Sequence, residues 1–186
     1  MQTNLETEIS EETFSPLPPI QERSLSSSEI QERRPYFKAI LNGEAFQVLM
    51  LCCYTKTLSV GEFIIGANGS KHSKSHFILA HRGRERIELA EILYFLECVA
   101  ITPDTNRSIT LWTACVKWYM EHPCKDWYGH PVQVWTTTSS PGSFLIPVKS
   151  INSRVVHVKH TRNFGSSLSN DTVYVVIPLM SNKFQF

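Results

Sequence analysis

AEILYFLECVAI (residues 90–101) and SITLWTACVKWYM (residues 108–120) are the two runs that decide the fold of this 186-residue chain. The first run is compatible with two periods, because alternate residues fit a strand while every third or fourth residue fits a helix. Its β-branched and aromatic content, and the polar turn PDTN after it, favour a strand from Glu91 to Ile101. The second run is apolar on both alternating faces, which is typical of a central strand. In the helical alternative, one apolar face of a helix would carry Ile87, Leu89, Ile92, Leu93 and Leu96.

Short apolar runs separated by turn residues continue on both sides of this pair. We predict a hairpin at Asn42-Gly43 between YFKAIL and FQVLMLCCYTKT, because Asn-Gly between apolar runs favours a two-residue turn. About eight strands with hardly any helix indicate a mainly β protein, either a twisted small barrel or a curled antiparallel sheet. The other strand candidates are SVGEFIIG, HFILAHRG, VQVW, SFLIPV, RVVHVKH and TVYVVIPL.

Composition divides the chain into a tail and a body. Residues 1–35 hold seven Glu against three Arg, a net charge of −4, whereas the remaining 151 residues carry 15 Lys and Arg against 10 Asp and Glu, a net charge of +5. The tail is rich in Ser and Pro and poor in large apolar residues, so we expect it to be disordered. The expected organisation is a disordered acidic tail (1–35), one β-rich domain (36–180) and a frayed C-terminus (181–186).

Cysteine usage and hydropathy predict an intracellular protein. Five cysteines are an odd number, and three of them lie within apolar runs, where a reduced thiol packs like a small hydrophobe. The N-terminus has no apolar signal segment, and the longest apolar runs fall short of the roughly 20 residues that span a bilayer. No membrane association is expected.

Catalytic and metal-binding patterns are scarce. His122, Cys124 and His130 lie close together in sequence, with Cys115 upstream, but zinc sites usually combine two closely spaced ligand pairs. A hydrolase would need Cys124 beside His130 or His157, yet no strand-turn-helix elbow surrounds that cysteine. We therefore expect no metal, no cofactor and no enzymatic activity, and we keep a zinc protein or hydrolase as the least favoured hypothesis.

A basic cluster offers an alternative function. Lysines and arginines between residues 71 and 86 are suited to following a phosphate backbone, although Glu85 and Glu88 are interleaved with them. Weak nucleic-acid contact and a solubilising loop explain the pattern equally well. The residues of this alternative site are Lys71, Lys74, Arg82, Arg84 and Arg86.

An aromatic group is the leading candidate for function. Trp and Tyr around a loop are typical of interfaces, because they supply apolar area and their ring faces attract ammonium groups. We predict that this group binds a protein or peptide ligand. The competing interpretation places Trp118 and Trp135 in the core and leaves only Trp127 and Tyr128 exposed. The predicted binding residues are Trp118, Tyr119, Trp127, Tyr128 and Trp135.

The order of motifs from residue 60 to residue 160 resembles the bromo-adjacent homology (BAH) domain, a β-rich chromatin interaction module. VGEFIIG is similar to the strand that opens that domain, and VKWYMEHP is similar to its W-F-Y-R-P segment without the arginine. IPVKSINSRVVHV matches a later segment through Pro147, Ile151 and Val156. The same region is similar to β-rich terminal modules of proteins encoded by eukaryotic DNA transposons. The resemblance implies a BAH-like fold, a chromatin partner and a nuclear location, while the transposon-type similarity favours a nucleic-acid-binding accessory domain.

Overall fold

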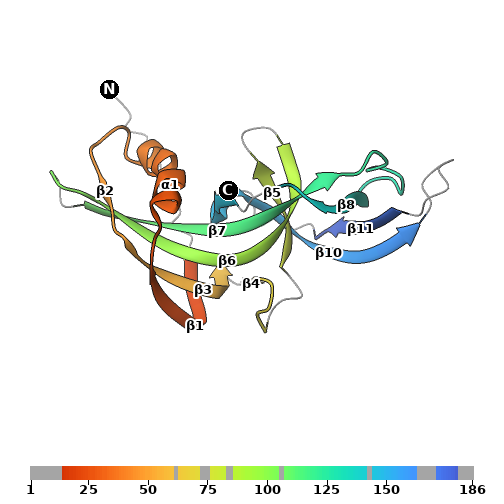
Figure 1. Cartoon of the computed structure of the whole chain (residues 1–186), viewed down its shortest axis with the longest axis horizontal. Helices are drawn as coiled ribbons and strands as arrows, with labels where there is room; N and C mark the ends of the chain where they lie inside the picture. The colour runs from red at the N-terminus through yellow and green to blue at the C-terminus, as the bar shows by residue number, and fades with distance from the viewer. Residues whose placement is uncertain are drawn as a thin grey trace, which may run out of the picture.

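The computed structural model describes residues 14–60, 63–71, 76–82, 86–104, 107–141, 144–162 and 171–179. Its elements lie along one extended antiparallel sheet, with a helix near one end and β8, β10 and β11 near the other (Figure 1). In chain order they are β1 (Phe14–Ser24), α1 (Ser27–Ile40), β2 (Gln47–Val48), β3 (Leu51–Val60), β4 (Phe63–Gly66), β5 (Phe77–Arg82), β6 (Arg86–Thr102), β7 (Arg107–Glu121), β8 (Gln133–Ser139), β9 (Phe144–Pro147), the 3-10 turn η2 (Val148–Ser150), β10 (Ile151–Arg162) and β11 (Asp171–Pro178).

The sheet curls until two of its strands meet. Its strand order is β1-β3-β6-β5-β10-β11-β8-β7-β9, and an additional pairing of β6 with β7 closes a ring through β6, β5, β10, β11, β8 and β7. The mainly β fold predicted from the sequence, in its form of a curled antiparallel sheet, is confirmed. The strand expected from Glu91 to Ile101 is also confirmed, as part of the longer strand β6.

The β6–β7 hairpin is the centre of the molecule. Its ladder runs from Ala90 opposite Trp118 to Thr102 opposite Arg107, with a register shift between Ile92 and Tyr94. Side chains on a strand alternate between faces, so each strand supplies two cores at once. On β7, Trp112, Ala114, Val116 and Trp118 point to one core, while Leu111 and Cys115 point to another.

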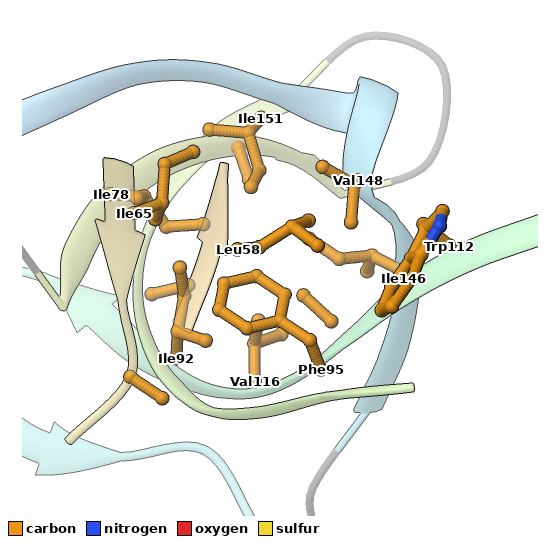
Figure 2. Packing of buried hydrophobic residues seen from close by; sticks show 14 of the residues in the cluster. Leu58, Ile65, Ile78, Ile92, Phe95, Trp112, Val116, Ile146, Val148 and Ile151 are labelled. Atoms are coloured by element: carbon orange, nitrogen blue, oxygen red, sulfur yellow. The ribbon is translucent and has the colours of Figure 1, made fainter. Parts of the chain in front are cut away.

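The inner core fills the space enclosed by the curled sheet. Figure 2 shows its side chains converging from several strands within a ring of ribbon. Because strands surround this space, a residue here is buried by neighbours that are distant in sequence. Its largest members include Leu58, Ile65, Ile78, Ile92, Phe95, Trp112, Trp118 and Ile151.

Two further cores lie on the opposite face of β6 and β7. The helix-side core, which includes Phe37, Leu41, Cys52, Leu96 and Cys98, lies where α1 covers the sheet. The ring core is made of residues from each strand of the closed ring. Its buried members are Phe77, Leu79, Leu89, Tyr119, Trp135, Val155 and Val176.

The predicted disorder of residues 1–35 is wrong for residues 14–35, and residues 1–13 lie outside the described part of the chain. β1 pairs with β3 from Phe14 opposite Val60 to Ser24 opposite Leu51. Its prolines are tolerated because β1 is at the edge of the sheet, where a missing N–H breaks no ladder on the outer side. The composition of residues 14–24 does not predict a strand, because most of the stabilisation of β1 comes from its pairing with β3. The expected frayed segment 181–186 also lies outside the described residues.

The hairpin predicted at Asn42-Gly43 is wrong as well, because residues 36–40 complete α1. Ser26 caps this helix: the backbone N–H of Glu29 donates to its hydroxyl, and the Glu29 carboxylate accepts from the Ser26 N–H at 2.9 Å. Asn42 and Gly43 both have positive φ, 49° and 88°, so they reverse the chain after the helix. The S-x-x-E pattern is the sequence signal that predicts this helix start.

Candidate functional site

The structure separates the predicted aromatic group into three places. Trp118 is 1% exposed in the inner core, whereas Tyr119 and Trp135 are buried in the ring core on the opposite face. The prediction that the five rings form one exposed binding surface is therefore wrong for these three. Neighbouring residues on a strand point in opposite directions, so a cluster in sequence does not become a cluster in space. Trp127 and Tyr128 are exposed, by 49% and 39%.

The two exposed rings lie on the aromatic loop, residues 122–132, which joins β7 to β8. Its backbone is held by hydrogen bonds: the Trp127 N–H donates to the Cys124 carbonyl at 3.0 Å, and the Val134 N–H donates to the Lys125 carbonyl at 2.8 Å. Gly129 has a φ of 75°, a conformation that favours glycine at this turn. The loop thus presents its rings from a defined backbone.

An apolar strip lies on β10 and β11. Val156 is opposite Ile177 in the ladder, so their side chains share one face, and Val158 on the same face is 59% exposed. This face also carries Val134 and Val173, which are buried and packed against Cys124 of the aromatic loop. The loop therefore covers one part of an apolar sheet face and leaves the strip beside it. The strip consists of Val156, Val158, Ile177 and Leu179.

A groove of about 650 Å³ lies where β6 and β7 separate. Their ladder ends at Ala90 opposite Trp118, and beyond it β6 continues along β5 while β7 continues along β8. The groove reaches the aromatic loop through Lys125. Its lining residues are Arg82, Arg86, Ile87, Glu88, Tyr119, Met120, Glu121, Lys125 and Ser140.

Aromatic rings and carboxylates fix two of the cations in this groove. Arg82 pairs with Glu88 at 2.9 Å, and its guanidinium lies over the rings of Trp118 and Phe144. Lys125 lies 4.9 Å from the centre of the Trp135 ring and 3.4 Å from a Glu121 oxygen. The buried tryptophans therefore contribute to the site by positioning its cations.

A polar network that the sequence does not predict reaches into the ring core. The Glu91 carboxylate is almost fully buried and accepts hydrogen bonds from the Tyr119 hydroxyl and the Asn68 amide, both at 2.6 Å. Burial, together with the hydrogen bond to Glu91, raises the pKa of Tyr119, so this phenol stays protonated and acts as a donor. The imidazole of His157 lies against Phe77 and Tyr174. Burial and the nearby His76 lower the pKa of His157, which keeps it neutral at neutral pH.

No sequence signal predicted this network, because its members come from distant segments. Glu91 is opposite Phe77 on β5 and opposite Lys117 on β7. Alternation along β6 places Glu91 beside Leu89 on the face of the ring core, so only the closing of the ring makes its environment polar and enclosed. The network anchors the strands that carry the groove.

The zinc ligand set and the Cys124–His157 pair proposed from the sequence are not assembled. Cys115 is buried in the helix-side core, and the His122 ring accepts a hydrogen bond from the Cys124 N–H at 3.0 Å. His157 faces the ring core, whereas Cys124 packs on the other face of the same strands. Among the described residues, no group of three or more His, Cys, Asp or Glu side chains has a metal-binding arrangement.

The basic cluster is only partly brought together. Arg82 and Arg86 both line the groove, and Lys71 is exposed on a turn before β5. Lys74 and Arg84 lie outside the described residues. Of the two cluster arginines that the structure describes in this groove, Arg82 is already paired with Glu88, so Arg86 is the one that the groove offers to a ligand. Nucleic-acid binding by the cluster stays a prediction.

Within the part of the chain that the structure describes, no helix combines the length and the hydropathy that crossing a bilayer requires. The chain matches no protein-family model, and comparison with curated proteins and with solved structures finds no match.

Proposed function

We propose that this chain is a non-catalytic protein-interaction module that binds a peptide segment of a partner protein through the aromatic loop. The observation that supports the proposal is the exposure of Trp127 and Tyr128 on a loop whose backbone is hydrogen-bonded to β8. Large rings on a fixed backbone lose little conformational entropy when a partner covers them, which is why Trp and Tyr dominate binding energies at interfaces.

The apolar strip extends the area that such a peptide can cover. It shares a sheet face with the valines that the aromatic loop buries, so an extended peptide lying across the loop can continue onto it. Each exposed ring contributes about 0.5–2 kcal/mol through apolar and cation–π contact, so the two rings together supply about 1–4 kcal/mol of the roughly 8 kcal/mol that micromolar binding requires.

The chemistry of the partner follows from charge and from the sequence motifs. The net charge of +5 on residues 36–186 favours a peptide with acidic residues. Because residues 60–160 resemble BAH domains, chromatin proteins are the first partners to test. The nucleus is accordingly the first location to test.

Trp127→Ala tests the proposal. A random peptide library displayed on phage is selected on the immobilised full-length protein, and enriched peptides are synthesised and titrated by fluorescence anisotropy. We expect Trp127→Ala to weaken binding about tenfold or more, equivalent to about 1.4 kcal/mol, and to leave the melting temperature within about 2 °C. The measurements are peptide affinity and thermal unfolding by circular dichroism.

Two variants serve as controls. Met50→Ala removes another exposed apolar side chain, from the segment between β2 and β3, and should change neither affinity nor stability. Trp118→Ala removes a ring from the inner core and should lower the free energy of unfolding by about 3–5 kcal/mol. The proposal fails if no peptide is enriched, or if the enriched peptides bind Trp127→Ala as tightly as the unmodified protein.

A further inference from the structure

The groove between β6 and β7 has the backbone of an incomplete sheet. Residues 86–89 of β6 pair with β5 on one side, and Tyr119 and Glu121 of β7 pair with β8. Among the described residues, no ladder is recorded on the sides of these two segments that face each other across the groove. Open strand edges carry unpaired N–H and C=O groups, which are a template for an added strand.

Charge in the groove is unbalanced at one position. Arg82 is paired with Glu88, and Lys125 is within 3.4 Å of Glu121. Arg86 lines the same groove and is exposed, and no ion pair is recorded for it within the described residues. Ile87 and Met120, which are 38% and 51% exposed, supply apolar wall on either side.

We infer that the groove takes an extended acidic peptide as an added strand along the open edge of β6, with a carboxylate of that peptide paired to Arg86. Main-chain hydrogen bonds to residues 86–89 supply affinity, the apolar wall accepts the alternate side chains, and the guanidinium selects the charge. The inference rests on the proposed function, because the bound peptide is the one that the aromatic loop anchors.

The path of the chain connects the two parts of this site. Lys125 lines the groove and lies two residues before Trp127, a separation of at most about 7 Å along the backbone. A peptide of about eight residues in extended form spans roughly 25 Å and reaches from the groove to the exposed rings. Specificity for acidic residues then belongs to the groove, and apolar anchoring belongs to the loop.

The first test uses peptides enriched from the random phage library and their synthetic variants. We expect enrichment of Asp or Glu beside apolar residues. Arg86→Gln should weaken the affinity for the best acidic peptide about tenfold. Arg86→Glu should reverse the charge preference: this variant should bind the peptide in which Lys replaces the key acidic residue more tightly than it binds the acidic peptide itself. Arg107→Gln is the matched control, because Arg107 is an exposed arginine at the other end of β7 and is not among the residues that line the groove.

The second test addresses the added strand. In this test, each peptide of a series is N-methylated at one residue. Methylation should weaken peptide affinity about tenfold or more at alternate positions and change it little at the positions between them. The reason is that antiparallel pairing uses every second residue on one edge. A loss without this alternation overturns the strand geometry.

The possible failures are distinguishable. Enriched peptides that depend on Trp127 but not on Arg86, or that show no acidic preference, overturn this inference and leave the proposed function standing. Peptides that depend on neither residue overturn both. Displacement of the acidic peptide by a single-stranded DNA 20-mer at 150 mM salt, with a steep dependence on salt, overturns the inference by assigning the groove to phosphate groups.

Discussion

Cys98 lies on β6 beneath α1 and is fully buried in the helix-side core. Burial raises the pKa of its thiol from an ordinary value of 9.0 to about 11, although the guanidinium of Arg33 and the hydroxyl of Thr113 act in the opposite direction. The desolvation cost of a thiolate therefore exceeds the attraction of the nearby cation. At neutral pH this thiol is protonated and behaves as a small apolar side chain.

Because of this thiol, the free energy of unfolding should depend on pH in the alkaline range. Because the pKa of Cys98 is higher in the folded state than in the unfolded state, its contribution is fully present below about pH 9 and is lost as the pH rises to about 11. We expect that loss to be at most about 2–3 kcal/mol. Urea unfolding of the unmodified protein and of Cys98→Ala at pH 7, 9 and 10.5 measures it. Identical pH dependence in the two proteins would exclude Cys98 as the source.

At the scale of the element, α1 depends on its first turn. Ser26 and Glu29 form a reciprocal cap, and the Glu29 carboxylate also pairs with Arg23 at the end of β1. Burial opposes ionisation of Glu29, but hydrogen bonds from Ser26 and Arg23 and the charge of Arg23 lower its pKa overall, so it is ionised at neutral pH. The cap therefore fixes the start of the helix and connects it to the edge strand.

Ser26→Ala should lower the free energy of unfolding by about 0.5–2 kcal/mol, because the backbone N–H of Glu29 loses its acceptor, the Ser26 hydroxyl. Ser27→Ala changes the neighbouring exposed serine, whose side chain has no hydrogen-bond partner in the described part of the chain, and should have an effect of less than about 0.5 kcal/mol. Chemical denaturation of the two variants, side by side, measures the difference. Equal effects would show that the cap contributes nothing specific.

For the whole molecule, residues 14–41 are part of the fold. α1 buries Arg33 and Phe37 completely, and Leu25 and Leu41 join the same core. A chain that starts at Tyr36 lacks β1 and most of α1, so it exposes the outer face of β3, β6 and β7. We expect it to aggregate or to have a melting temperature at least about 10 °C lower. The free energy lost with several large core contacts is a large fraction of the free energy of unfolding of a small domain.

A chain that starts at Phe14 is the control for this truncation, since it keeps every contact described above. Size-exclusion chromatography and thermal unfolding compare the two chains. If the shorter chain is monomeric and as stable as the longer one, the helix-side core does not need α1, and the domain boundary predicted at Tyr36 is correct after all.

Local pattern predicted much of the sheet and little of the site. The strands at residues 77–82, 133–139 and 171–178 were predictable, because each contains alternating apolar residues and is flanked by turn residues. Residues 14–40 were not, because composition measures what a segment can bury by itself, and this segment is stabilised by β3 and by the outer face of β6. Its capping box at Ser26 was a usable local signal.

The sequence by itself determined that this chain is mainly β, that the β6–β7 pair is its centre, and that a loop carrying aromatic residues follows this pair, because period and turn chemistry are local properties. Only the tertiary structure decided which rings are exposed and which are core, where β6 and β7 separate, and which groove cation has no ion-pair partner among the residues that the structure describes. These features depend on how the sheet curls and closes, which brings together strands that no sequence interval connects.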